Sequence, residues 1–224
     1  TIQTTLNVAA GSTLKTDAGS TNFITVNAGG TVVIDGTLMV SKLKGLFISN
    51  TPGSNGGAIQ FNGTENGLTL GTASTVEYNK SNHANSYNIT GMNYVNLTIS
   101  GLDNNKALAG DISVSGVLSI NTTESSTLTT GIYNVTLGSN ASAVFGPQAV
   151  LNITGGTTNF NSRPVTLKSS VSGTARIGAI TGDNSTTGLI GATNVTVERY
   201  IPAKRAWRAL TSPVSSGISK LTFT

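Results

Sequence analysis

The most constraining feature of this sequence is a short phrase that recurs along it, in which a small polar residue lies between two apolar residues. Three copies lie between Tyr94 and Ile120, at positions 97–99, 112–114 and 118–120. Each copy has one apolar face with a period of two residues, which is typical of a short, half-buried strand. Gly101, Gly110 and Gly116 end these strands within a few residues. We therefore expect an all-β chain of many short strands.

The phrase also recurs at a regular interval. Residues 6–14 align with residues 24–32 at an offset of 18 residues, and this match places Asp17 on Asp35. A period near 20 residues, made of short strands and glycine turns, is typical of a parallel β-helix, in which each strand pairs with its copy one coil away at about 4.8 Å. A β-sandwich is the alternative, since alternating strands also build one. The self-match favours a right-handed parallel β-helix (β-solenoid), because sandwich strands need not resemble each other.

In such a helix the apolar residues of each phrase stack inward and the polar ones outward. Three stretches without this pattern, 50–57, 79–88 and 182–188, are predicted to be surface loops because they are rich in turn-forming residues. The residues expected inward include Val26, Leu97, Val114 and Leu137, and those expected outward are their neighbours Thr25, Thr98, Ser113 and Thr136.

Composition excludes several classes of protein. Of 224 residues, 37% are hydrophobic and only 10% are charged, with a formal net charge of +4. This balance is too apolar and too weakly charged for intrinsic disorder. The chain has no cysteine, so it is stabilised without disulfides. No apolar run approaches the roughly 20 residues that a membrane-spanning helix needs.

The charge changes sign towards the C-terminus. Residues 1–160 contain five basic and seven acidic residues, whereas residues 161–224 contain eight basic and two acidic residues and the single Trp. A β-helix leaves unpaired strand edges at its last coil, which favour aggregation unless they are covered. We predict a β-helix over 1–197 and, over 198–224, a segment that caps it or begins a further β domain. The candidate residues of this cap or junction are Arg199, Tyr200, Ile201, Arg205, Trp207 and Arg208.

The sequence offers little for catalysis or for metal binding. Glycoside hydrolysis needs two carboxylates about 5–9.5 Å apart, but no two of the nine acidic residues lie within two positions of each other. Asp17 and Asp35 would stack about 5 Å apart on successive coils, yet each occurs in a turn, where Asp caps the local backbone. His83 is the only histidine, which excludes a catalytic triad and a His-rich metal site. We predict no catalytic, cofactor or metal site.

Nucleic acid is also excluded as a partner. The basic residues between Arg199 and Arg208 form one short stretch that contains Pro202. A nucleic-acid-binding protein has instead a broad basic surface or a recognisable binding motif. These arginines are expected to serve the cap or junction.

Several segments together resemble a known family. Residues 94–101, 106–112, 128–131 and 173–178, and above all the block from Asn194 to Val214 with its Val197-Glu198-Arg199-Tyr200-Ile201-Pro202 run, resemble large secreted surface proteins of Bacteroidetes. The resemblance implies a β-helical, adhesin-like region of a protein exported by the type IX secretion system. It implies a secreted or cell-surface location, with the secretion machinery and a surface polysaccharide or another cell-surface protein as partners. Residues 218–224 do not look like the sorting domain that ends such proteins, so we expect a piece of a longer polypeptide.

These observations lead to a functional expectation with two alternatives. We expect a non-catalytic extracellular β-solenoid segment that acts as an adhesin or a structural stalk. The first alternative is a polysaccharide-active β-helix enzyme, a hydrolase or a lyase, which two carboxylates converging in a cleft would favour. The second alternative is a carbohydrate-binding module, which exposed aromatic side chains lining a groove would favour.

Overall fold

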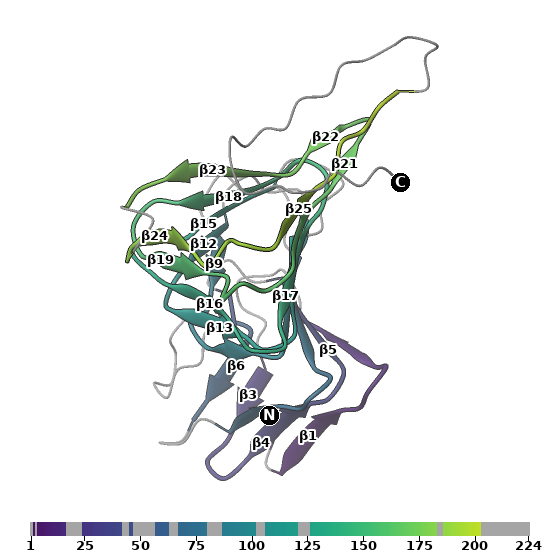
Figure 1. Ribbon diagram of the computed structural model, residues 1–224. Coiled ribbons are helices and arrows are strands. Elements are labelled where there is room, and N and C mark those ends of the chain that lie inside the picture. The colour runs from purple at the N-terminus through teal and green to yellow at the C-terminus, as the bar shows by residue number, and fades with distance from the viewer. Residues whose placement is uncertain are drawn as a thin grey trace.

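The computed structural model describes residues 2, 4–16, 24–41, 45–46, 57–62, 67–79, 87–101, 106–120, 126–182 and 186–202. This part of the chain contains 25 strands and no helix. All the sheets are parallel except one two-stranded hairpin. The prediction of an all-β chain is confirmed, and the parallel sheets agree with the pairing that the repeat predicted (Figure 1).

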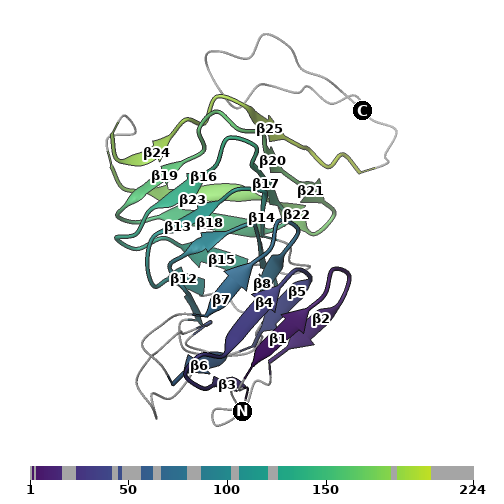
Figure 2. The same ribbon diagram turned by 90° about the horizontal axis from the view of Figure 1, so that it is seen from below.

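Most strands pair with the strand three places along the sequence, or five places along where a two-stranded hairpin intervenes, so the chain visits three faces in turn. One face is a single continuous parallel sheet, which we call the eight-stranded face (Figure 2). Its strands, in spatial order, are β2 (Thr13–Lys15), β5 (Thr37–Val40), β8 (Thr75–Tyr78), β11 (Asn96–Ile99), β14 (Val117–Ile120), β17 (Ser142–Phe145), β20 (Val165–Leu167) and β25 (Val195–Val197).

Each of the other two faces is made by two sheets, and a circuit is defined here as three successive strands with one on each face. The second face contains β1 (Thr5–Val8), β4 (Thr31–Ile34) and β7 (Leu68–Leu70), then β10 (Asn93–Tyr94), β13 (Ile112–Val114), β16 (Val135–Leu137), β19 (Thr157–Asn159) and β24 (Gly188–Ile190). The third face contains β3 (Ile24–Val26) and β6 (Ile59–Phe61), then β9 (Tyr87–Ile89), β12 (Lys106–Leu108), β15 (Ser126–Thr129), β18 (Ala149–Ile153) and β23 (Arg176–Ile180). The antiparallel hairpin of β21 (Ser169–Ser170) and β22 (Gly173–Thr174) interrupts one circuit.

The 18-residue step predicted between coils is wrong. Hydrogen-bonded side chains on adjacent circuits are 20 residues apart at Asn93 and Ser113 and 26 residues apart at Thr5 and Thr31. Residues 6–8 belong to β1 on the second face, whereas residues 24–26 form β3 on the third face. The matching phrase therefore marks individual strands, and a full circuit adds one more strand and its loops.

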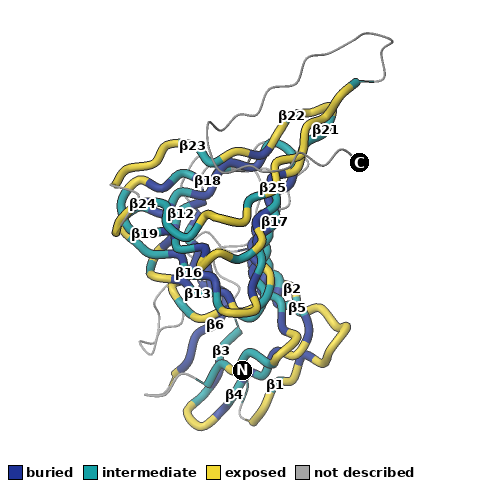
Figure 3. The backbone as a smooth tube through the Cα atoms, viewed as in Figure 1, coloured by how far each residue is buried: buried dark blue, intermediate teal, exposed yellow. Residues whose placement is uncertain are grey.

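The predicted direction of the side chains is confirmed. Val26, Leu97, Val114 and Leu137 are fully buried, while the polar residues beside them in sequence are half-buried. Along the eight-stranded face the buried row runs through Leu38, Val76, Leu97 and Leu118, each paired in register with the next. Buried and more accessible residues alternate in the same way along most of the strands (Figure 3), whereas β6, β18 and β23 depart from this pattern.

Two boundaries also bear on the predictions. The stretch 79–88 is not wholly a loop, because Tyr87 and Asn88 belong to β9. Strand β25 ends at Val197, and the described chain ends at Pro202, so the division into 1–197 and 198–224 stays a prediction. No helix in the described residues is long and apolar enough to cross a membrane.

Candidate interaction surface

The acidic residues that the structure describes lie apart and each has a local role. Glu77 accepts a hydrogen bond from Ser100 at 2.5 Å, and Asp111 accepts one from the backbone amide of Asn134 at 2.8 Å. Glu198 accepts one from the backbone amide of Ser169 at 3.3 Å. These carboxylates bind neighbouring backbone or hydroxyl groups, as turn-capping residues do. Among the described residues no three histidine, cysteine or acidic side chains gather to hold a metal ion.

The predicted stacking of Asp17 on Asp35 depends on the 18-residue step and fails with it. Asp17 lies outside the described residues. The register of β4 continues to place Asp35 between Ala9 on one side and Gly71 on the other. A Cβ atom on Gly71 would lie 1.8 Å from a carboxylate oxygen of Asp35, so this carboxylate lies directly against the glycine. Asp35 therefore occupies the space that a side chain on the next circuit would need.

A projecting surface is built where the chain leaves the last two strands of the eight-stranded face, β20 and β25. We call it the C-terminal wing: the hairpin β21–β22 with its turn, residues 169–174, and the extended residues 198–202. Ser169 joins the two parts, since its backbone amide donates to Glu198 and its hydroxyl accepts from the backbone amide of Tyr200 at 3.0 Å. The same hydroxyl lies 2.7 Å from that of Thr174 across the hairpin. Figure 1 shows the wing extending away from the stacked circuits.

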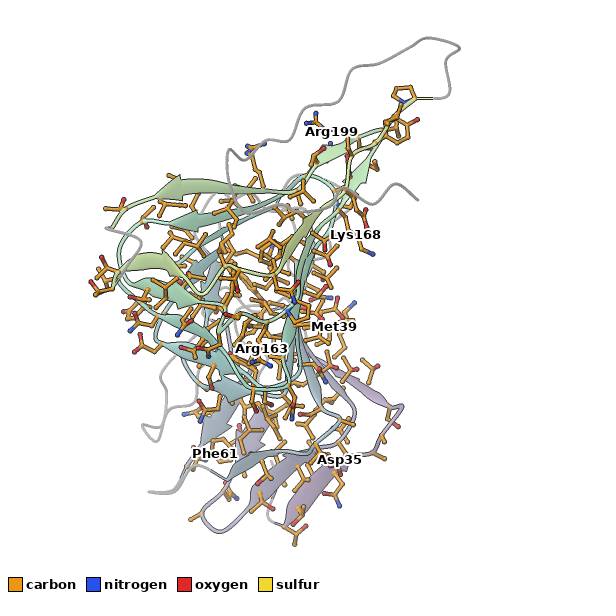
Figure 4. All side chains as sticks on the ribbon, viewed as in Figure 1. Asp35, Met39, Phe61, Arg163, Lys168 and Arg199 are labelled. Atoms are coloured by element: carbon orange, nitrogen blue, oxygen red, sulfur yellow. The ribbon has the colours of Figure 1, made fainter. Side chains whose placement is uncertain are left out.

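The wing exposes apolar side chains beside basic ones. Val171 at the hairpin turn is 79% exposed, and Tyr200 and Ile201 are 44% and 45% exposed. Lys168 and Arg199 are exposed at the same end of the molecule, far from Asp35 near the opposite end (Figure 4). Exposed aliphatic and aromatic groups next to arginine are a composition found in the centre of protein–protein interfaces.

The predicted cap or junction residues are only partly placed. Arg199, Tyr200 and Ile201 lie on the wing and are exposed, and their role as a cap or junction stays a prediction. Arg205, Trp207 and Arg208 lie outside the described residues. Whether they cover the last circuit stays a prediction.

The outward side of the eight-stranded face is the other extended surface. Along one outward row, residues pair in register from strand to strand without an aromatic side chain among them. Because this row has no aromatic side chain on which a sugar ring could stack, it gives no support to the carbohydrate-binding module. The row consists of Lys15, Met39, Glu77, Thr98, Ser119, Val144, Thr166 and Thr196.

A buried cluster of three tyrosines escaped the sequence analysis, because Tyr87 lay in a stretch interpreted as a loop. Tyr78 contacts Tyr87 and Tyr94 edge-on, with ring centroids 5.8 and 6.4 Å apart. The hydroxyl oxygens of Tyr78 and Tyr94 are 2.8 Å apart. Burial raises the pKa of Tyr78 and, more strongly, that of Tyr94, where the nearby Tyr78 adds to the effect. One sequence signal was present, namely three tyrosines within 17 residues in a chain that has five.

The raised pKa values predict a loss of stability at alkaline pH. Because the folded state favours the neutral phenol, the unfolded state ionises first, from about pH 10. Stability from this source is therefore complete below that pH and falls above it, by at most about 1.4 kcal/mol per pH unit for each tyrosine until its folded-state pKa is reached, so Tyr94 contributes over the wider pH range. Urea titrations at a series of pH values, with tyrosinate absorbance, check this. A double Tyr78→Phe and Tyr94→Phe variant should show a shallower decline, and an equally steep decline would contradict the assignment.

The comparisons with known proteins add no assignment. No protein-family model, no curated protein and no solved structure matches this chain. The argument for function therefore depends on the geometry of the described residues.

Proposed function

We propose that this chain is a right-handed parallel β-helix that acts as a non-catalytic stalk in a secreted or cell-surface bacterial protein, of the kind exported by the type IX secretion system. The observation that carries the proposal is the eight-stranded face, a single parallel sheet to which every third strand of the regular stack contributes. A sandwich would need antiparallel pairs, whereas the only antiparallel pair among the described strands is the hairpin β21–β22. Seven steps of about 4.8 Å give the face a length of roughly 35 Å.

The dispersed carboxylates support the non-catalytic part of the proposal. Retaining and inverting glycosidases both need two carboxylates flanking one bond. Glu77, Asp111 and Glu198 belong to different circuits, and each is bound to a neighbouring residue. An enzyme is therefore less favoured than a non-catalytic stalk.

The first experiment measures turnover. Purified chain incubated with plant, algal and bacterial polysaccharides should release no reducing ends and no unsaturated products. Turnover that disappears in Asp35→Asn, Glu77→Gln or Asp111→Asn would overturn the stalk and establish the enzyme. Turnover that persists in all three variants and co-purifies with the chain would also overturn the non-catalytic proposal and would assign the chemistry to other residues.

Adhesion through the wing is a second candidate function, favoured by its exposed apolar groups beside Arg199. The partner would be another cell-surface protein, since the surface is aliphatic and aromatic rather than an open sugar-stacking platform. Beads coated with the chain should bind cells that display the partner, and Tyr200→Ala with Ile201→Ala should abolish this binding. Thr98→Ala, on the outward side of the eight-stranded face, is the matched control and should bind normally. Binding equally reduced by the control, or unaffected by the wing variant, would contradict the wing as the adhesive surface.

A further inference from the structure

Two of the three faces are interrupted at nearly the same level of the stack. On the second face the sheet that ends with β7 is separate from the sheet that begins with β10, and on the third face β6 and β9 belong to separate sheets. The eight-stranded face alone runs through this level, by way of β5, β8 and β11. Among the described residues, strand-to-strand hydrogen bonding therefore connects the first circuits to the later ones on one face only. We call strands β1–β7 the N-terminal block and strands β9–β25 the C-terminal block, with β8 joining them on the eight-stranded face.

A short segment fills the gap on the third face. The carbonyl of Gly45 accepts a hydrogen bond at 3.1 Å from the backbone amide of Ala58, directly before β6. On its other side Gly45 lies against β9, since a Cβ atom there would be 2.2 Å from the carbonyl oxygen of Asn88. The φ angle of Gly45 is +70°, which glycine adopts without strain. Leu46 is fully buried in the core at this level. Residues 45–46 thus lie between the two blocks where strands β6 and β9 would otherwise pair.

The tyrosine cluster supplies side-chain hydrogen bonds at the interrupted level. The hydroxyl of Tyr87 in β9 donates to the carbonyl oxygen of Val40 at the end of β5. The hydroxyl of Tyr94 in β10 donates to the carbonyl oxygen of Thr90 at 2.6 Å, and the backbone amide of Thr90 donates to Tyr78 at 3.2 Å. A tyrosine can fill the core and still satisfy a backbone group, which phenylalanine cannot do. The bond from Tyr87 to Val40 joins the C-terminal block directly to the N-terminal block.

From this geometry we infer that the interruption is a hinge, at which the N-terminal block opens as a separate cooperative unit and the tyrosine cluster acts as its latch. The buried core is continuous through this level, but among the described strands only one face of three carries strand pairing across it. Cooperative opening of contiguous segments follows where the interactions across a boundary are weaker than those within each side. In a stack of circuits, stability is the sum of the circuits and of the interfaces between them, so a weakened interface divides the stack there. The inference goes beyond the stalk proposal and holds whatever the chain binds.

Native-state hydrogen exchange in increasing urea tests the hinge on the unaltered full chain. We expect the hydrogen-bonded amides of the N-terminal block, such as Asp35 bonded to Val8, to exchange together through one opening. Amides of the C-terminal block, such as Gly146 bonded to Ile120, should exchange through a later opening of higher free energy. The change should be a step between β7 and β9. A single opening shared by all strands, or a gradual rise in protection from β1 onward without a step, would overturn the hinge.

The latch is tested by Tyr87→Phe, which keeps the ring and removes the bond to Val40. The buried carbonyl of Val40 then keeps only the backbone amide of Asn79 as a donor. Loss of the second bond should accelerate exchange of the N-terminal block by up to about tenfold while the C-terminal block is unchanged. The control is Tyr133→Phe, which removes a hydroxyl from the C-terminal block away from the cluster and should accelerate neither block preferentially. Equal acceleration of both blocks by Tyr87→Phe would contradict the latch. The comparison of the two blocks in the unaltered chain does not depend on the folding of either variant.

Discussion

Replacing Val114 with aspartate should prevent the chain from folding. Val114 is fully buried in β13, in register between Tyr94 and Leu137 on adjacent circuits. The residues in register with it, Tyr94 and Leu137, carry no opposite charge, and burial of an unpaired charge costs several kcal/mol even after the pKa of the group shifts. That cost is comparable with the whole stability of a domain, which is about 5–15 kcal/mol. Circular dichroism and size-exclusion chromatography of the expressed variant check the expectation.

Ser113→Asp is the matched control, one residue earlier on the same strand. Ser113 points outward, is half-buried and donates a hydrogen bond to the side chain of Asn93 at 2.6 Å. A carboxylate at this position reaches water and can accept from the amide group of Asn93, so the variant should fold and lose less than about 1 kcal/mol. Equal tolerance of aspartate at 113 and 114 would show that the register of β13 is wrong.

Phe145→Ala should have the second-largest effect. Phe145 is fully buried in β17, in register with Ile120 and Leu167, and its ring centroid lies 6.4 Å from that of Phe160. Removal of the ring leaves a cavity that a stack of parallel strands cannot close easily, so the free energy of unfolding should fall by about 3–5 kcal/mol. A urea titration followed by circular dichroism measures this change.

The neighbouring residue provides the comparison. Val144 precedes Phe145 on the same strand and is half-buried on the outward side of the eight-stranded face. Val144→Ala removes a smaller group that already contacts water, so the loss should stay below about 1 kcal/mol. A loss as large as that of Phe145→Ala would mean that the inward and outward rows of β17 are exchanged.

The sequence predicts the strands well because the signal for each strand is local. The phrases at 97–99, 112–114 and 118–120 became β11, β13 and β14. Their apolar residues are buried as the period of two requires.

The assignment of strands to faces could not be predicted, because it depends on the loops. Phrases that look alike, such as those in β1 and β3, lie on different faces. Partner residues are 20 apart at Asn93 and Ser113 but 38 apart at Ser41 and Asn79. No single offset describes such a chain, so the 18-residue match could not give the circuit. For the same reason the sequence could not show that Asp35 lies between Ala9 and Gly71.

The sequence also could not predict which polar side chains are buried. Tyr87 follows a stretch rich in asparagine and serine, and its role is set by Val40, 47 residues earlier. Lys106 is fully buried at an inward position of β12, where its amine approaches the carbonyl oxygen of Gly101 at 3.4 Å. A lysine is normally expected to face solvent. Lys106 is directed inward because it lies in register with Tyr87 and Leu128 on the adjacent strands.

The most direct test of the account is a nuclear Overhauser measurement of strand pairing on the eight-stranded face. Strands β11 and β14 should show cross-strand contacts between backbone amide and Hα protons in a parallel register, with Leu97 opposite Leu118 and Ile99 opposite Ile120. The same pattern should link β11 to β8, with Leu97 opposite Val76. Contacts of β11 with a strand next to it in sequence, in an antiparallel register, would contradict the stacked circuits and with them the proposed β-helix.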